Sequence, residues 1–291
     1  METSATVTSG AEHQSSADPS AWLTVAAVAG LVGVLYAAVV IDLASEWWTD
    51  SSASYGMLIP PTALYIAYLR RRHTLAFPAR PDMRGLWLIL SACGVFLLGK
   101  LAGEFFLTRV SLVVLLAGLT WTFWGFARCK TLVFPFILLG TMVPLPAIVY
   151  NTAAAPLQLF ASTVATDLAQ MLGVSIYRDG NIIQLAHTSL GVEEACSGLH
   201  SLSALVVASL LLGFLENGTL FGRLLLFAFS VPLAIAVNVF RVTGTALLAD
   251  YRPEWAMGFY HSFSGWLVFI LGFATLWLLG KTLFRLTKTK T

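Results

Sequence analysis

The sequence predicts an all-α polytopic membrane protein with about eight transmembrane helices, one amphipathic or re-entrant outer-face helix and a short outer-face β-hairpin. Three observations predict this fold class. Of the 291 residues, 57% are hydrophobic and only 11% are charged, whereas a soluble domain carries about 25% charged residues. Apolar runs long enough for a bilayer recur along the chain. The Lys and Arg residues gather in a few clusters between those runs.

The eight apolar runs define the expected membrane helices, since a spanning helix needs roughly 20 apolar residues. They are Trp22–Asp42, Tyr55–Leu69, Leu86–Leu101, Leu107–Phe126, Leu132–Tyr150, Ser197–Leu215, Leu220–Leu248 and Phe263–Phe284. A further run, Ala155–Val174, contains polar residues such as Asp167 and is amphipathic. Residues 1–20 are small and polar, which indicates a disordered cytoplasmic tail before a single domain, 21–291.

Basic clusters predict the orientation, because Lys and Arg favour the cytoplasmic side of a membrane. They lie at 70–84, at 128–130 and in the C-terminal tail. Counting crossings from either end places both termini inside and the stretch from Tyr150 to Cys196 outside. We therefore expect Ala155–Val174 to lie in the interface or to re-enter, and a true ninth spanning helix is the alternative.

The segment 175–185 (SIYRDGNIIQL) has an Asp-Gly turn between β-prone residues. This pattern predicts a hairpin at the outer face, with a plain surface loop as the alternative.

Cysteine count and net charge exclude several classes of protein. The three cysteines, Cys93, Cys129 and Cys196, are too few for a disulfide framework, and their spacing is not typical of a metal site. The net charge of +2 does not indicate a nucleic-acid partner. We expect no metal and no organic cofactor.

Arg241 is the most unusual residue of the apolar runs. It precedes Asp250 by nine residues, hence by roughly 13 Å along a helix. Charged groups at such depth are costly and are often functional. Asn238 lies three residues earlier on the same helical face. The alternative is an arginine that snorkels outward or pairs with a carboxylate.

Cys196 follows two carboxylates, Glu193 and Glu194, where a membrane helix is expected to begin. A helix N-terminus lowers the pKa of a thiol, whereas the glutamates raise it, so activation needs a cation or a base. Ser197 and Gly198 follow, and Gly198 permits close approach of another chain. The alternative is an ordinary small buried residue.

His261 begins the last helix at the outer side, where it can act as a general acid or base. His200 is a rival, four residues after Cys196, but groups on facing helices pair better than neighbours on one helix. Cys196, Arg241 and His261 together form an acyl-transfer set, in which a thiolate attacks, a histidine moves the proton and a cation stabilises the oxyanion.

These residues resemble the exosortase/archaeosortase family of membrane transpeptidases. The resemblance rests on FPFILLGTMVPLP, YRDGNIIQL, VEEACSGLHSL, NVFRV and FYHSFSGWLVF, in this order. It implies that Cys196, Arg241 and His261 are catalytic, and Glu193, Glu194, Ser197, Gly198, His200 and Asn238 are candidates to support them or to bind substrate. In the first outer loop the family often has Tyr-Ser-His-Gly, where this chain has Ala-Ser-Tyr-Gly at 53–56.

The resemblance also implies partners and a location. The expected substrates are exported proteins with a C-terminal sorting signal: a Pro-Glu-Pro-type motif, a transmembrane helix and a basic tail. The resemblance does not identify the acceptor, for which a lipid- or glycan-linked group is one candidate, and the pathway is often tied to exopolysaccharide production. The enzyme is expected in the cytoplasmic membrane with its active site at the outer face. The alternatives are an intramembrane cysteine protease that only hydrolyses, and a non-enzymatic subunit of polysaccharide assembly or export.

Overall fold

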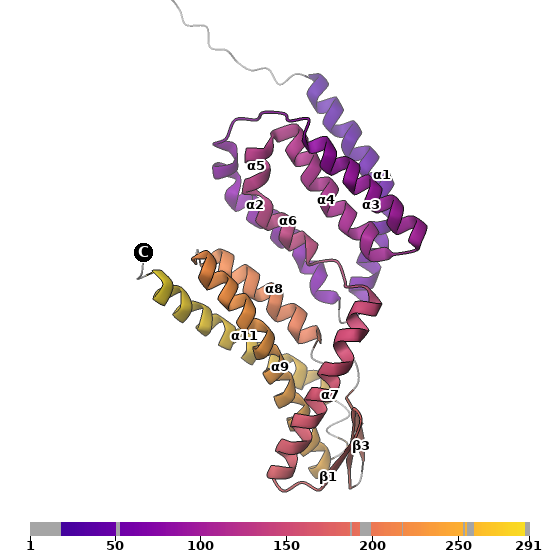
Figure 1. Ribbon diagram of the computed structural model, residues 1–291, viewed down its shortest axis with the longest axis vertical. Coiled ribbons are helices and arrows are strands. Elements are labelled where there is room, and N and C mark those ends of the chain that lie inside the picture. The colour runs from indigo at the N-terminus through magenta and orange to yellow at the C-terminus, as the bar shows by residue number, and fades with distance from the viewer. Residues whose placement is uncertain are drawn as a thin grey trace, which may run out of the picture.

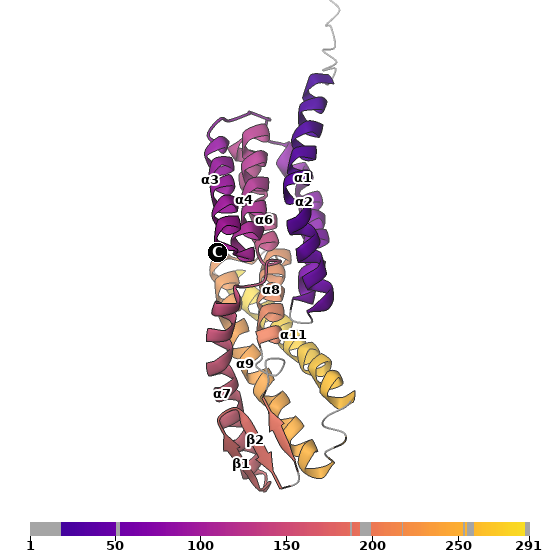
Figure 2. The same cartoon turned by 90° about the vertical axis from the view of Figure 1, so that its right-hand side faces the viewer.

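The computed structural model describes residues 19–50, 53–186, 188–192, 199–216, 218–252, 254 and 259–288. The chain is mostly helical, as Figures 1 and 2 show. Its helices are α1 (Pro19–Thr49), η1 (Ser54–Leu58), α2 (Ile59–Leu75), α3 (Gly85–Ala102), α4 (Phe105–Trp124), α5 (Phe126–Thr131), α6 (Val133–Gly140), α7 (Ala147–Met171), α8 (Leu199–Leu215), α9 (Leu220–Tyr251) and α11 (Phe259–Lys288). Its strands are β1 (Ile176–Asp179), β2 (Ile182–Leu185) and β3 (Ser189–Gly191). Of the expected disordered tail, residues 1–20, residues 1–18 lie outside the described residues, whereas Pro19 and Ser20 belong to α1.

Five of the described helices are long and apolar enough to cross a membrane. These segments are Leu23–Thr49, Gly85–Ala102, Phe105–Trp124, Leu220–Tyr251 and Phe263–Leu286. They confirm a multi-pass membrane protein, while the count of eight crossings stays a prediction. The apolar part of α8, Ser201–Leu215, is shorter than these five.

The expected helix Leu132–Tyr150 differs most from the structure. Helix α6 ends at Gly140, after eight residues, and α7 begins at Ala147. Pro144 and Pro146 lie between them, and a proline lacks the N–H that a continuing helix needs and disfavours helical geometry in the residue before it. The segment therefore bends at the prolines, and Tyr150 belongs to α7.

The N-terminal helices α1 to α6 pack as one group. Gly99 and Gly118 bring α3 and α4 close together, because a Cβ on either residue would lie about 3 Å or less from the facing helix. Arg109 of α4 is buried and forms an ion pair with Glu46 of α1. This ion pair fixes the end of α1 that leads into η1.

The sheet forms a small cap at one end of the molecule (Figure 1). Strands β1 and β2 make the expected hairpin, antiparallel with Ile176 opposite Leu185, and Gly180 in the turn has a φ of 62°. β3 pairs antiparallel with β2 and is an addition to the predicted hairpin. One apolar cluster joins the second half of α7, the sheet and residues 239–246 of α9. We call these segments, together with the last turn of α9, the cap.

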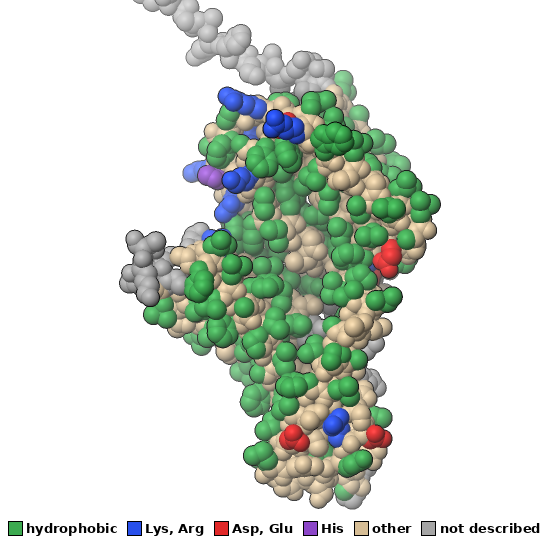
Figure 3. Space-filling model, in the orientation of Figure 1, with side chains coloured by type: hydrophobic (Ala, Val, Ile, Leu, Met, Phe, Trp, Pro, Cys, Tyr) green, Lys and Arg blue, Asp and Glu red, His purple; other side chains and the backbone are tan. Residues whose placement is uncertain are grey.

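The opposite end of the molecule is basic. Figure 3 shows Lys and Arg gathered at the end remote from the cap, with hydrophobic side chains along the sides. This basic end includes the loop between α2 and α3 and the short helix α5 with Arg128 and Lys130. The Arg70 guanidinium of α2 lies 4.5 Å from the centre of the Phe214 ring of α8, so α8 also ends at the basic end.

Candidate functional site

The candidate nucleophile lies in a short segment whose two ends are described. Cys196 belongs to residues 193–198, with Glu193, Glu194, Ser197 and Gly198, all outside the described residues. Before this segment, the N–H of Val192 donates to the carbonyl of Asn181 at 2.9 Å, and the Asn181 amide donates back to the carbonyl of Val192 at 3.2 Å. After it, α8 begins at Leu199. The segment therefore connects the cap to the first turn of α8.

Arg241 lies far along α9 from the basic end. It is 21 residues from Leu220, which is about 31 Å at 1.5 Å per residue. The hydrocarbon core of a bilayer is about 30 Å thick. If α9 enters the membrane near its start, Arg241 lies at the edge of the hydrocarbon on the cap side. The remaining residues of α9 extend into the cap.

The guanidinium group of Arg241 lies beside Gly265 of α11. A Cβ built on Gly265 would lie 3.4 Å from both Cζ and Nη2 of Arg241. Gly265 thus leaves room beside the guanidinium for a Cβ at ordinary contact distance. Asn238, one turn earlier on the same stripe of α9, is only 2% exposed, and both its Oδ1 and the Nε of Arg241 are buried.

Position 261 lies close to this contact. His261 precedes Gly265 by four residues on α11, so the two positions share a helical face and differ by about 6 Å along the axis. Only the backbone of His261 is described. Helix α11 therefore brings the expected histidine position to within about one turn of the Arg241 guanidinium.

A common contact of three helices sets the height of these groups. A Cβ on Gly272 of α11 would lie 3.2 Å from Leu205 of α8 and 3.5 Å from Val237 of α9. From this level, Leu199 is about 9 Å, Arg241 about 6 Å and Gly265 about 10 Å further toward the cap, at 1.5 Å per residue. The start of α8, the guanidinium and the adjoining turn of α11 are therefore at similar heights.

The two faces of α9 have different roles. Val239, Val242 and Ala246 face α7 and the sheet in the cap cluster. Ala234 lies on the stripe of Arg241 and packs instead with Leu205 of α8 and Leu276 of α11. The cap thus covers one side of α9, and the arginine stripe faces the other two helices.

The rival position, His200, lies on a different side of α8. Its backbone position shares a face with Ser203, Val207 and Phe214 by helical spacing. Val207 and Phe214 pack into the core of the N-terminal helices, whereas Leu205 faces α9 and α11. Position 200 therefore lies on the face of α8 that includes Val207 and Phe214, a different face from that of Leu205.

The other two cysteines lie elsewhere. Cys93 is exposed on α3, and Cys129 is buried in α5 at the basic end. Within the described residues, no group of three His, Cys, Asp or Glu side chains could hold a metal ion.

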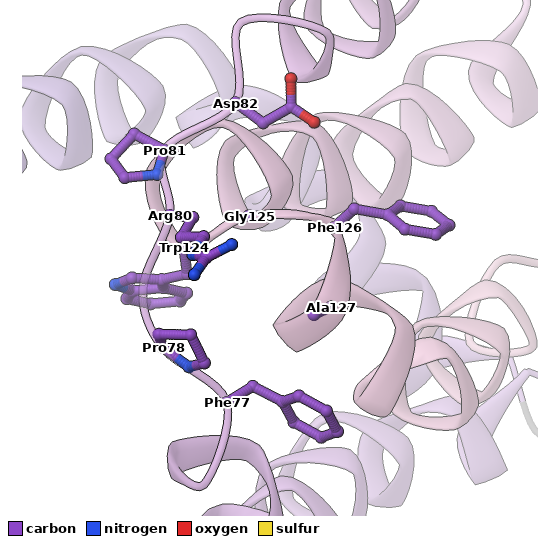
Figure 4. A pocket seen from close by; sticks show the side chains of 9 residues that line it. All are labelled: Phe77, Pro78, Arg80, Pro81, Asp82, Trp124, Gly125, Phe126 and Ala127. Carbon is purple, nitrogen blue, oxygen red and sulfur yellow. The ribbon is translucent and has the colours of Figure 1, made fainter.

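A hollow of about 490 Å³ lies at the basic end, shown in Figure 4. It is lined by Phe77, Pro78, Arg80, Pro81, Asp82, Trp124, Gly125, Phe126 and Ala127. The hydrogen bond from the Trp121 indole lowers the pKa of Asp82, and the backbone N–H of Arg84 lowers it further. Because this hollow lies at the opposite end from the Arg241 contact, it is not part of the candidate site.

The family model of the transmembrane exosortases matches residues 47–278. The chain belongs to the transmembrane exosortase family. The match runs from the end of α1 into α11 and so includes Cys196, Arg241 and His261. Among curated proteins and among solved structures, nothing matches this exosortase.

Sequence reasoning missed one feature near the candidate site. Gly265 has no reactive group, and only its place in HSFSGW, four residues after His261, marks it in the sequence.

Proposed function

We propose that this exosortase is a membrane cysteine transpeptidase that cleaves C-terminal sorting signals of exported proteins and transfers the product to an acceptor. The observation that carries the proposal is the contact between the Arg241 guanidinium and Gly265, one turn from His261. It lies at the height at which the Cys196 segment joins α8.

The cation has the right setting for an oxyanion. A fixed, partly desolvated guanidinium stabilises developing negative charge far more than a solvated one does. Arg241 lies beside Gly265 of α11 and has a buried Nε atom. In the proposed mechanism it stabilises the tetrahedral intermediate that forms when the Cys196 thiolate attacks the scissile carbonyl.

The histidine moves the proton in both half-reactions. The His261 imidazolium donates its proton to the departing amine as the C–N bond breaks, which leaves a thioester on Cys196. Neutral His261 then takes a proton from the acceptor nucleophile as it attacks the thioester. The thiolate departs, and the enzyme returns to its starting state.

The charge distribution supports an outer-face site. The basic end carries the arginines of α2, the α2–α3 loop and α5, and the positive-inside rule assigns such an end to the cytoplasm. The cap and Arg241 then face outward, with both termini cytoplasmic. This location gives access to proteins that have already been exported, each with a transmembrane helix and a basic tail in its signal.

Processing in cells tests the proposal. The chain is expressed with a tagged substrate that carries a Pro-Glu-Pro-type C-terminal signal, and processing is followed by gel shift. Cys196→Ala should abolish processing, whereas Cys93→Ala, at an exposed cysteine of α3, should leave it intact. Processing by Cys196→Ala at the normal rate would remove the thiol mechanism and favour a non-enzymatic subunit.

The mass of the product separates transfer from hydrolysis. Transfer leaves the new C-terminus joined to an acceptor, lipid- or glycan-linked in our expectation. Hydrolysis leaves a free carboxylate. A free carboxylate on all of the product would make the chain a protease rather than a transpeptidase.

A further inference from the structure

The sheet of the cap has one edge that a helix covers and one edge that is exposed. On the β1 side, the side-chain amide of Gln170 in α7 donates to the carbonyl of Ile176 at 3.0 Å. On the other side β3 is the last strand, since the order in the sheet is β1-β2-β3 (Figure 1). Ser189 and Gly191 of β3 are both exposed. The accessible edge of the sheet is therefore the edge at β3.

The register of the ladder shows which backbone groups this edge presents. Val192, directly after β3, donates to the carbonyl of Asn181 at 2.9 Å, in register with the pairing of β2 and β3. Hydrogen-bonded pairs alternate along an antiparallel ladder, so Leu190 also bonds to β2. Ser189 and Gly191 therefore direct their N–H and C=O groups away from β2. No backbone hydrogen bond among the described residues reaches these four groups.

An extended peptide is the chemical match for this edge. The outward groups come from two residues that are two apart, which is about 6.6 Å at 3.3 Å per residue. An extended peptide presents its own N–H and C=O groups along one side with the same repeat. Peptides that add to the edge of a sheet are held by such main-chain hydrogen bonds. The repeat selects a peptide over a lipid head group.

The exposed edge lies beside the candidate site. Val192 belongs to the same apolar cluster as Val239 and Val242 of α9, and these two valines flank Arg241 in the sequence. The end of β3 therefore lies near the stretch of α9 that carries the arginine. A peptide bound along β3 is on the cap side of the molecule, as the proposed reaction requires.

A segment of the form Pro-x-Pro suits the outermost strand of a sheet. A proline has no N–H, so it is tolerated at an edge where its nitrogen faces away from the sheet. Successive residues of a strand direct their N–H and C=O groups to opposite sides. When both prolines face away, the residue between them directs its N–H and C=O to β3. Each proline also favours an extended conformation in the residue before it, which reduces the entropy lost on binding.

We propose that the edge of β3 binds the substrate by strand addition, in which an extended peptide pairs with Ser189 and Gly191. The residue between the two prolines of the sorting signal supplies the pairing N–H and C=O. This inference rests on the proposed function for the identity of the peptide. Access to the edge and binding at it can be measured without turnover.

Hydrogen exchange of single backbone amides tests the inference directly. The full chain with Cys196→Ala is placed in lipid vesicles and given a synthetic peptide with a central Pro-Glu-Pro motif. In the free chain the amides of Ser189 and Gly191 should exchange at least about tenfold faster than that of Leu190, which is bonded to β2. Saturating peptide should slow the two edge amides about tenfold or more and leave Leu190 within about twofold of its rate.

Variants of the peptide test the direction of its backbone. N-methylation of the glutamate removes the N–H that faces β3 and should weaken binding about tenfold, at the upper end for loss of one hydrogen bond. N-methylalanine in place of the first proline is the matched control, since it also lacks an N–H and faces away. Its Kd should lie within about twofold of that of the starting peptide.

Variants of the chain test the same bonds from the other side. Gly191→Pro removes an outward N–H and no bond to β2, and Gly191 does not have a positive φ that a proline would oppose. It should weaken binding about tenfold. Gly191→Ala retains the N–H and should bind normally. Thermal unfolding of both variants shows that the fold is retained.

Slow exchange of the Ser189 and Gly191 amides in the free chain would overturn the inference, because the edge would then be covered by the chain itself or by a second copy. Absence of protection by the peptide would overturn it too, whether or not the intact chain processes the same signal. Equal binding of the peptide with the N-methylated glutamate would exclude strand addition. These results differ from failure of the proposed function, which shows as normal processing by Cys196→Ala.

Discussion

Replacing Gly265 with residues of increasing size should reduce activity in steps while the fold survives. A Cβ at this position would lie 3.4 Å from Cζ and Nη2 of Arg241, which is ordinary contact. Gly265→Ala should therefore be active, and a helix gains up to about 1 kcal/mol when alanine replaces an interior glycine. In Gly265→Leu the next carbon extends about 1.5 Å further, so the guanidinium must move by about 1 Å or more.

A shift of this size should have a large effect on turnover. Misplacement of a reacting or stabilising group by 1 Å can cost about 10²-fold in rate. We therefore expect kcat of Gly265→Leu to fall about 100-fold, with Gly265→Ala within about threefold of the starting protein. The assay is single-turnover processing of a sorting-signal substrate in vesicles, beside a thermal unfolding measurement for each variant.

The matched control is Gly272→Ala on the same helix. A Cβ there would press on Leu205 at 3.2 Å and not on Arg241. This variant should affect stability without a specific loss of kcat. A Gly265→Leu variant that folds and turns over normally would show that the contact with Arg241 has no part in the reaction.

Three further predictions concern charge and orientation. Arg241→Lys retains the charge but loses the planar fork, so kcat should fall about 10²-fold if Arg241 stabilises an oxyanion; recovery of most activity by Lys would reduce its role to charge balance. Glu46→Gln leaves the Arg109 guanidinium buried without its ion pair and should lower the free energy of unfolding by about 3 kcal/mol. This value is at the low end for buried ion pairs because the Glu46 side chain is 32% exposed. An unchanged unfolding temperature in detergent would contradict this prediction. The orientation can be tested in a cysteine-free background with a membrane-impermeant maleimide added to intact cells stripped of their outer envelope. Asp179→Cys in the hairpin should react in these cells, whereas Pro78→Cys in the α2–α3 loop should react only after lysis. The reverse pattern would show that the orientation is inverted.

Much of the fold could be predicted because the bilayer imposes length and polarity on each helix. The apolar runs locate α3, α4, α9 and α11 to within four residues of their ends, whereas α1 continues seven residues beyond the predicted end at Asp42, to Thr49. The hairpin could be predicted from Asp179-Gly180, because Gly180 adopts the positive φ that the turn requires. These features depend on local sequence.

The misses depend on contacts between distant segments. Strand β3 has only three residues, Ser189–Gly191, and forms because β2 offers an edge to it. The run Leu132–Tyr150 is mostly apolar, and hydropathy does not distinguish Pro144 and Pro146 from other apolar residues. The effect of these prolines on helix continuation could nevertheless have been foreseen.

The candidate site likewise combines residues that local sequence identifies with residues that only contacts between distant segments identify. The types of residue needed for acyl transfer stand out in the sequence, because an arginine in an apolar run and a cysteine at a helix start are both unusual. Their neighbours do not. Gly265 is significant only because the side chain of Arg241 lies beside it.

The length of α9 changes the expected depth of Arg241 in the membrane. Measured from Asp250, the arginine lies roughly 13 Å inside the helix end, which suggests a charge deep in the bilayer if that end marks the membrane surface. However, α9 has 32 residues, or about 48 Å, against a hydrocarbon core of about 30 Å. Its last turns pack in or beside the cap, where Ala246 and Ala249 are fully buried. If α9 enters the membrane near its start, the helix end lies beyond the membrane surface and Arg241 lies near the boundary.

A boundary position reconciles the two demands on this arginine. A charge costs less near the interface than at the bilayer centre, so the helix can carry it. Cleavage and transfer of a peptide need polar substrates and proton exchange, which the hydrocarbon core excludes. At the boundary the guanidinium is within reach of a polar substrate, while the cap on one side of α9 and Gly265 of α11 on the other limit its access to water. In the proposed orientation, the cap provides the outer half of α9 with a protein environment in place of lipid, which allows a charged group to remain fixed where the membrane ends.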